Sequence, residues 1–467
     1  MRKSAAENFA RVVLVFLGGF FLPRVAGAQP PEGVPRLTLR ECLERARSYH
    51  PDLAPLRWDV EAARARLREA EAGRYPTASV TSITGVVPSV RGQVHEPPID
   101  TVSKKGDLGP FTRVELEFVQ PLFTWGKIRA GREAARHGLE REKARGVEKE
   151  REVLFEVKKQ YYGVLLSSQV AGLLDEVQRN FEKAVSIAER RLLEGEGTVT
   201  QADVLKLRVG LAGIARELHK ARAGAELSKD ALARSIGFRS GAEFELAERN
   251  LVPVVAELKS LEEYAAEALS RSPEWKQLVE GIEAKKAQVR MARSEFLPSF
   301  FVAGGFRYGY APFRERQLSP FAKDDFNFLD LPGATFGIRW PLDFFRADAE
   351  ADRARAELES LEARKRGARS GIRLAVKRAY LETLQTRAGL SEAGRGRKAA
   401  RGLLLGTVSG FELGVGEAKD VFEALVVYTQ ATSAYYEAVH DYNVAVARLS
   451  KVVGEEIERL GEPSGRQ

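Results

Sequence analysis

The chain has 467 residues, of which 44% are hydrophobic and 30% charged, a composition typical of a protein that folds around a core. Its net charge is +8, but basic and acidic residues alternate at helical spacing, as over 148–152, so we expect solvated helix faces and no nucleic-acid partner. The five histidines show no metal-ligand spacing, and no glycine-rich segment lies between a buried parallel strand and a helix. We therefore expect no enzyme activity, no cofactor and no metal site.

Residues 1–28 have the pattern of a secretory signal peptide. Arg2 and Lys3 are positive, the apolar run over 12–22 is too short to cross a bilayer, and small residues over 26–28 form a cleavage site. No cysteine directly follows this site, so we expect an exported protein without an N-terminal lipid anchor. The only cysteine of the chain, Cys42, lies in a helical pattern and is predicted to be a small buried side chain.

The remainder of the chain repeats itself at a spacing of about 220 residues, which indicates a duplicated domain. Thr38-x-x-Glu41 corresponds to Ser260-x-x-Glu263, and Pro76 corresponds to Pro298. The predicted units are a first repeat over 29–245, a second over 246–456 and a polar tail over 457–467.

Each repeat is predicted to hold a strand hairpin followed by one very long helix and a shorter return helix. All twenty prolines lie outside 122–252 and 342–462, as long uninterrupted helices require. In the first repeat we expect a helix over 52–73, strands over 77–87 and 112–121, a long helix over 126–194 and a return helix over 201–236. In the second we expect a helix over 274–295, strands over 299–310 and 333–342, a long helix over 346–408 and a return helix over 417–453. In each copy the two shorter helices would stack end to end beside the long one.

The strands alternate between apolar or aromatic residues and charged residues or glycine, as in transmembrane β-barrels. The alternation is clear in the second copy and weaker in the first. The predicted lipid-facing girdle consists of Phe306, Tyr308, Tyr310, Phe336 and Trp340, and the predicted lumen-facing residues are Glu115, Glu117, Arg307 and Arg339. A soluble hairpin with one wet face against the helices would give the same pattern.

Four strands cannot close a barrel, and open sheet edges are not tolerated in lipid. The chain is therefore expected to associate with copies of itself. Two copies would give a small filled barrel, and three would give twelve strands with room for a pore. The loops over 88–112 and 312–332 would then lie outside the cell, with the helices in the periplasm.

These segments resemble the TolC family of outer-membrane efflux and secretion ducts over nearly the whole mature chain. The resemblance rests on the segment over 37–53, on Gln120-Pro121-Leu122 and Trp340-Pro341-Leu342 after the hairpins, and on the segment over 420–454. It implies a mainly α protein with a small transmembrane β part. As a homotrimer, this would be a twelve-stranded β-barrel continuous with an α-helical barrel that crosses the periplasm.

The resemblance further implies an exit duct of a tripartite efflux or type I secretion system, with a periplasmic adaptor and an inner-membrane pump as partners. The implied periplasmic tip and adaptor contact consists of Gly197, Thr198, Thr200, Asp203, Gly414, Gly416 and Asp420, residues that would also cap any helical hairpin. Arg397, Lys398 and Arg401 stand where we expect the pore constriction, so that constriction is predicted to be basic or apolar. The alternative function is a soluble periplasmic coiled-coil adaptor without a barrel.

Overall fold

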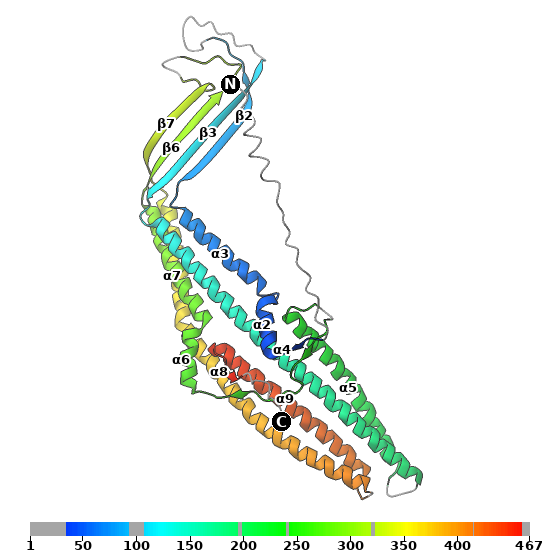
Figure 1. Cartoon of the computed structure of the whole chain (residues 1–467). Coiled ribbons are helices and arrows are strands. Elements are labelled where there is room, and N and C mark those ends of the chain that lie inside the picture. The colour runs from blue at the N-terminus through cyan, green and yellow to red at the C-terminus, as the bar shows by residue number, and fades with distance from the viewer. Residues whose placement is uncertain are drawn as a thin grey trace.

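The computed structural model describes residues 34–92, 107–194, 199–239, 242–318, 323–413 and 415–459. It is a long molecule with a four-stranded sheet at one end and helix tips at the other (Figure 1). Two helices run through most of its length, α4 (Lys127–Glu194, 68 residues) and α8 (Phe344–Glu412, 69 residues). At 1.5 Å per residue each is roughly 100 Å long.

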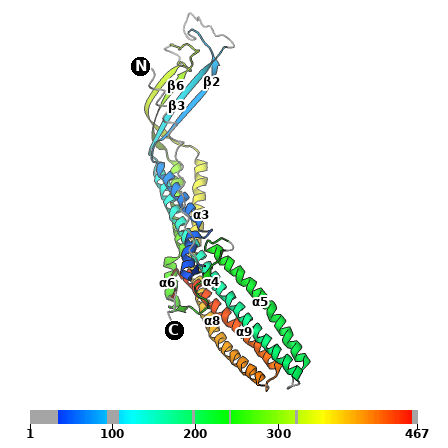
Figure 2. The same cartoon turned by 45° about the vertical axis from the view of Figure 1, so that its right-hand side comes forward.

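Shorter helices pair with the long ones over separate halves. Near the sheet, α3 (Ala54–Ala72) packs on α4, and α7 (Pro273–Arg293) packs on both α4 and α8. In the tip half, α5 (Gln201–Ser235) packs on α4 and α9 (Ala418–Val453) on α8, while α4 and α9 contact each other. The helical layer of this half therefore runs α5, α4, α9, α8, with α5 and α8 as its outer edges (Figures 1 and 2).

The helix starts are capped by local side-chain chemistry. Thr38, Thr200 and Ser260 each accept a hydrogen bond from the backbone N–H three residues later, where an acidic side chain bonds back. These capping boxes begin α2 (Leu39–Tyr49), α5 and α6 (Leu261–Arg271). Gly454 ends α9 in the left-handed conformation at φ 78°, which glycine adopts without a Cβ penalty.

The sheet is antiparallel, with the strand order β2-β3-β6-β7. Its strands are β2 (Thr77–Pro88), β3 (Leu108–Phe123), β6 (Ser299–Tyr310) and β7 (Phe328–Arg339). β7 begins at Phe328, before the predicted residue 333. The strand can contain Pro332 because β7 lies at the edge of the sheet, where the missing N–H of a proline costs no hydrogen bond within the sheet. The register of β6 against β7 shifts between Gly305 and Arg307, and Gly333 next to this shift has φ 70°.

Short strand pairs, which no sequence pattern predicts, gather at mid-height. β1 (Arg36–Leu37) runs parallel to β4 (Glu245–Leu246), and β5 (Val255–Ala256) runs antiparallel to β8 (Glu458–Arg459). The tail predicted from 457 onward is therefore partly packed, since Glu458 is only 4% exposed. A one-turn helix, η1 (Ser294–Phe296), leads from α7 into β6.

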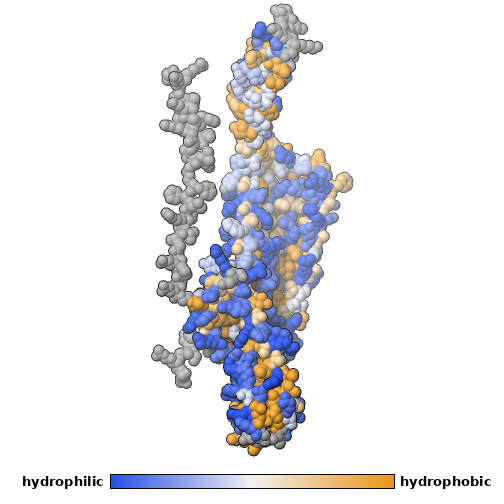
Figure 3. All heavy atoms as spheres, turned by 90° about the vertical axis from the view of Figure 1, so that its right-hand side faces the viewer, coloured by the Kyte–Doolittle hydropathy of each residue, from blue (hydrophilic) through white to orange (hydrophobic). Residues whose placement is uncertain are grey.

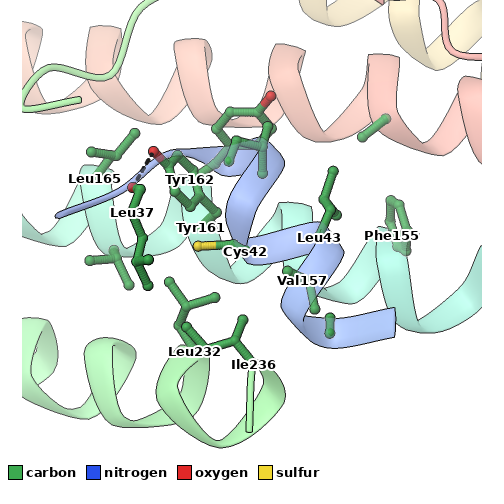
Figure 4. Close-up of a cluster of buried hydrophobic side chains, with 14 of the residues drawn as sticks. Leu37, Cys42, Leu43, Phe155, Val157, Tyr161, Tyr162, Leu165, Leu232 and Ile236 are labelled. Carbon is green, nitrogen blue, oxygen red and sulfur yellow. Dashed lines mark hydrogen bonds between the residues drawn. The ribbon is translucent and has the colours of Figure 1, made fainter. Parts of the chain in front are cut away.

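A hydrophobic core fills this middle region (Figure 4). Cys42 from α2 lies fully buried among side chains of α4 and α5, including Tyr161 and Ile236, which confirms the predicted small buried residue. Burial raises the pKa of the Cys42 thiol to about 12, so it stays protonated and unreactive. Among the helices of the described ranges, none combines the length and the apolar character that a membrane crossing needs.

Candidate functional site

The sheet separates polar and apolar side chains onto opposite faces. In the antiparallel register Glu115 lies opposite Arg307, Glu117 opposite Gly305 and Arg339 opposite Ser299. Directly opposed residues share a face, so the four residues predicted from the sequence as lumen-facing lie on one face. Ion pairs join neighbours there, Arg113 to Glu115 at 3.3 Å and Arg307 to Asp330 at 3.2 Å. This face is built for contact with water.

The other face carries the aromatic residues. Phe306 lies opposite Leu116, Tyr308 opposite Val114, and Phe336 opposite Val302. The rings of Phe300 and Phe336 stack at 6.0 Å, and those of Tyr308 and Tyr310 at 6.5 Å. Phe336 is 64% exposed and Tyr310 52% exposed. An apolar face of this extent indicates contact with an apolar medium or partner.

Trp340 directly follows β7. Its indole N–H donates to the carbonyl of Phe296 at 3.1 Å, and its ring lies edge-on to Phe344, the first residue of α8. Trp125, in the turn before α4, makes a similar bond from its indole N–H to the carbonyl of Pro298 at 2.9 Å, which joins the two repeats. These amphipathic rings lie where the sheet meets the helices, as expected of residues at the boundary between an apolar layer and water.

Both outer strands of the sheet have one unpaired edge. β2 pairs only with β3 and β7 only with β6 among the strands that the structure describes. The two free edges have the same length, 12 residues each. A free edge presents unpaired N–H and C=O groups along its length, to which a further strand can pair.

The tip positions predicted from the sequence are partly described. Thr200 and Asp203 form a capping box, in which the Thr200 hydroxyl donates to Asp203 at 2.6 Å, and these hydrogen bonds hold the pKa of Asp203 below its usual value. Asp420 is exposed in the first turn of α9, and the structure shows it no such box. The N–H of Gly416 donates to the carbonyl of Gly410 at 3.0 Å. Gly197, Thr198 and Gly414 lie outside the described residues.

Contacts between the end of α4 and the end of α8 hold the two helix tips together. The Arg191 guanidinium of α4 donates to the carbonyl of Glu412 at 3.1 Å and lies 4.9 Å from the Phe411 ring centre. Apolar residues that were not predicted from the sequence project from this end. Leu193 is 88% exposed, Leu413 80% and Val415 85%. The one sequence signal for this exposure is the position of these residues beside the glycine-rich turns. Hydrophobic residues gather towards this end in Figure 3.

The predicted constriction residues lie well before the end of α8. Arg397 and Arg401 precede its last residue by 15 and 11 positions, roughly 22 and 16 Å along the axis. The guanidinium of Arg397 rests on the Tyr435 ring at 4.6 Å, so this side chain is held against α9. Lys398 and Arg401 are exposed. In the described ranges, no three His, Cys, Asp or Glu side chains lie together as a metal site would need.

The profile of the family described as outer membrane efflux protein matches residues 42–238 and 265–455, most of the chain. The chain belongs to this family. It is an exit duct of the outer membrane, with a helical part and a β part, and nothing supports the alternative of a soluble adaptor without a barrel.

Solved structures share its fold at low sequence identity. The outer-membrane channel OprN has 17% identity and a TM-score of 0.71, over 89% of each chain. VceC from Vibrio cholerae has 17% identity and a TM-score of 0.70, over 90% of this chain and 97% of that one. The open state of the Neisseria gonorrhoeae channel MtrE has 17% identity and a TM-score of 0.70, over 90% of each chain. No curated protein matches the sequence.

Proposed function

We propose that three copies of this efflux protein, exported by the signal peptide over 1–28, form one closed channel. Their sheets would join into a twelve-stranded barrel, continuous with an α-helical barrel in the periplasm. The channel would conduct substrates passively from an adaptor and pump complex, of an efflux or type I secretion system, to the cell exterior. The observation that carries this proposal is the pair of free edges on β2 and β7, equal in length and intolerable in lipid unless paired.

The outer helices of the tip half support association as well. On α5, Leu205 is 50% and Val209 73% exposed, four and eight residues after the helix begins. On α8, Leu405 is 59% and Leu403 48% exposed, seven and nine residues before the helix ends. Because both helices meet the tip at these ends, the two apolar sets lie at similar heights on opposite edges of the layer. The apolar set on α5 of one copy would pack against the apolar set on α8 of a neighbouring copy.

The same match recurs nearer the middle of the molecule. Leu227 of α5 is 72% exposed, and Leu381 and Leu384 of α8 are 52% and 40% exposed. Apolar side chains left in water at matched heights on two edges favour a closed ring of copies over a single chain.

In this channel the aromatic face meets lipid and the charged face lines the lumen. Phe306, Tyr308, Tyr310 and Phe336 would lie in the membrane, with Trp340 at its periplasmic boundary. Glu115, Glu117, Arg307 and Arg339 would face the transported substrate. Their mixed charges give the barrel a wet wall without a preference for one sign.

The helix tips would receive the periplasmic adaptor. Exposed Leu193, Leu413 and Val415 offer an apolar contact, and the caps at Thr200 and Asp203 hold the α5 start in place behind it. Gly197, Thr198, Gly414, Gly416 and Asp420 would complete the surface.

The pore constriction is proposed at Lys398 and Arg401, because Arg397 already contacts Tyr435. A basic constriction repels multivalent cations. Reconstituted channels should therefore conduct normally with low concentrations of trivalent cations on the periplasmic side. Block of the current by such ions would contradict this assignment.

Disulfide trapping tests the closed ring. Thr81 of β2 and Thr335 of β7 lie on the same polar face, one on each free edge, and the native Cys42 is buried. A panel that pairs Thr335→Cys with cysteines at Ser79 and Thr81, which share the polar face of β2, should give cross-linked dimers and trimers in outer-membrane fractions. Each single-cysteine variant is the control and should stay uncross-linked. Only monomers from the whole panel, or a protein that leaves the membrane on carbonate washing, would refute the channel.

A further inference from the structure

The segment that joins β6 to β7 lies at the end of the sheet farthest from the helices (Figure 1). Its described residues, 311–318 and 323–327, are called the strap below. The sequence predicts an extracellular loop here. The structure shows that the strap folds back onto the sheet.

The strap buries the polar face of the sheet. At the start of β3, Gly109 and Phe111 are buried, whereas Leu108 and Pro110 are exposed. Residues two apart on a strand lie on the same side, and the register of β3 is unbroken here, so Gly109 and Phe111 share a face with Glu115. That is the face proposed above to line the lumen.

Direct contacts place the strap on this face. A Cβ on Gly109 would lie 2.6 Å from Phe313 of the strap, and the Phe111 ring lies edge-on to Phe326 at 5.3 Å. On β6, a Cβ on Gly309 would lie 2.7 Å from the carbonyl oxygen of Phe326. The two glycines allow the strap to approach the strands this closely.

The strap also reaches across the sheet to the first hairpin. The N–H of Val90 donates to the carbonyl of Phe313 at 3.3 Å, and the N–H of Glu315 donates to the carbonyl of Val90 at 3.0 Å. The Arg314 guanidinium donates to the carbonyl of Pro88, the last residue of β2, at 2.8 Å. The strap therefore passes the end of β3 and spans the sheet from β7 to β2.

Internal contacts give the strap a defined shape. The Arg314 guanidinium lies 4.2 Å from the Phe326 ring centre. Asp324 accepts the backbone N–H groups of Gln317, Phe326 and Asn327 at 2.7, 2.9 and 3.0 Å. The Asn327 amide in turn donates to the carbonyl of Arg314 at 2.9 Å. The strap is therefore held both to itself and to the sheet.

A strap on the inner face takes up much of the room in a closed barrel. Twelve strands about 4.8 Å apart and tilted by about 40° give a circumference of about 75 Å, so opposite backbones are about 24 Å apart. A layer that packs on the face of a sheet lies roughly 10 Å from it. Straps on opposite walls would therefore leave an opening of only a few ångströms.

From this arrangement we propose that the three straps of the trimer form a constriction inside its outer mouth. The contacts that hold each strap down then decide how large a solute can leave. Phe313, Arg314 and Phe326 are the residues that set this limit, and a larger solute passes only when the strap leaves Gly109 and Phe111. The proposal rests on the trimeric channel proposed above, and it adds a size-selective element at the exit.

Labelling of a lumen cysteine from outside the cell tests the constriction. Glu117→Cys places a thiol on the polar face, eight residues along β3 from Gly109, while the native Cys42 is buried. The probes are maleimides on neutral polymers of increasing size, chosen to be too large to cross the outer membrane elsewhere. With the native strap, the large probes should react slowly.

Releasing the strap should admit the large probes. Arg314→Gln with Phe326→Ser, in the Glu117→Cys protein, removes the bond to Pro88 and both ring contacts. We expect labelling by the large probes to become about tenfold faster, the effect of losing one hydrogen bond and one cation–π contact. Leu329→Ser, a similar loss on the opposite face of the sheet, should leave the rates unchanged.

A second variant displaces the strap from the side of the sheet. Gly109→Leu puts a side chain where Phe313 lies, so it should also speed labelling by the large probes. Gly85→Leu is the matched control, because Gly85 lies opposite Phe111 on the same face and a Cβ there has nothing within 4 Å. This pair gives the readout even where the double variant does not fold.

Two results would overturn the constriction. One is rapid labelling by the large probes with the native strap in place, and the other is the same rate in Gly109→Leu and Gly85→Leu. Native electrophoresis of the same membranes reports on the channel itself. Absence of the trimer there would contradict the proposed channel, whereas trimers with equal labelling rates would contradict only the constriction.

Discussion

Lys158 is a buried cation at the centre of the molecule. It is 5% exposed and bonds to both Glu456 and Glu458, while the Tyr162 hydroxyl donates to Glu458 at 3.2 Å. Burial opposes the charge on Lys158, but the two carboxylates outweigh it and raise the pKa of the lysine. The lysine therefore fastens the segment after α9 to the middle of α4.

Removing this lysine should destabilise the protein strongly. Lys158→Met leaves Glu458 buried without its counter-charge, and we expect a loss of about 3–5 kcal/mol. Lys159→Met is the control, because Lys159 is half exposed and its ion pair with Glu156 is long, so we expect at most about 1 kcal/mol. Thermal unfolding of the purified protein measures both. Equal midpoints for the two variants would show that the buried pair contributes little.

Asp203 gives the start of α5 a pH dependence. Its pKa is lowered by hydrogen bonds from Thr200, so the carboxylate stabilises the helix start above about pH 4 and this support is lost as the pH falls further. Hydrogen exchange of the peptide over 199–210 should show lower protection in Asp203→Asn at neutral pH, by about 1 kcal/mol. Glu217→Gln, farther along the same helix, should leave this peptide unchanged. If the peptide of Asp203→Asn is as protected as that of the wild type, the capping box does not stabilise this helix start.

At the scale of elements, α5 approaches α4 and α9 closely at one glycine. A Cβ on Gly210 would lie 2.6 Å from the Phe422 ring and 2.7 Å from the Phe181 ring, which contact each other edge-on. Gly213, one turn later, has nothing within 4 Å of such an atom. The absence of a side chain at Gly210 therefore sets the distance between these helices.

The two glycines make a matched pair for mutation. Gly210→Ala should destabilise the tip half by about 1–3 kcal/mol through overpacking. Gly213→Ala should stabilise it by about 0.4–1 kcal/mol, because alanine restricts the unfolded chain at no steric cost. Denaturant or thermal unfolding distinguishes the signs. Stabilisation by both changes would show that the rings move aside freely.

The helical elements were largely predictable, and the middle of the molecule was not. The exclusion of proline gave the positions of α4 and α8, and Thr200-x-x-Asp203 gave the start of α5. β7 was placed late because Pro332 indicates a loop unless the strand is known to lie at an edge. The strand pairs at mid-height are two residues long, too short for any periodic pattern, and Lys158 meets Glu458 across 300 positions. The stacking of Arg397 on Tyr435 likewise depends on how two helices pack.

At the scale of the whole molecule, the apolar residues on the edges of the helical layer should decide assembly. Replacing Leu381 and Leu384 together by arginine would place two charges where a neighbouring α5 is proposed to pack. We expect the variant to be monomeric in native electrophoresis or light scattering. Ser370→Arg, an exposed polar position on the same helix, should assemble normally. A trimeric leucine variant would place the contact between copies elsewhere.

The two free edges of the sheet differ from each other, since one is β2 and the other β7. In a ring each copy therefore gives one edge and receives the other, and a chain damaged at a single edge can still join from its sound side. Such a chain would inactivate every complex into which it is incorporated, because the ring could not close. When equal amounts of sound and damaged chain are made together, about one complex in eight would be free of the defect, so the mutation would be dominant-negative.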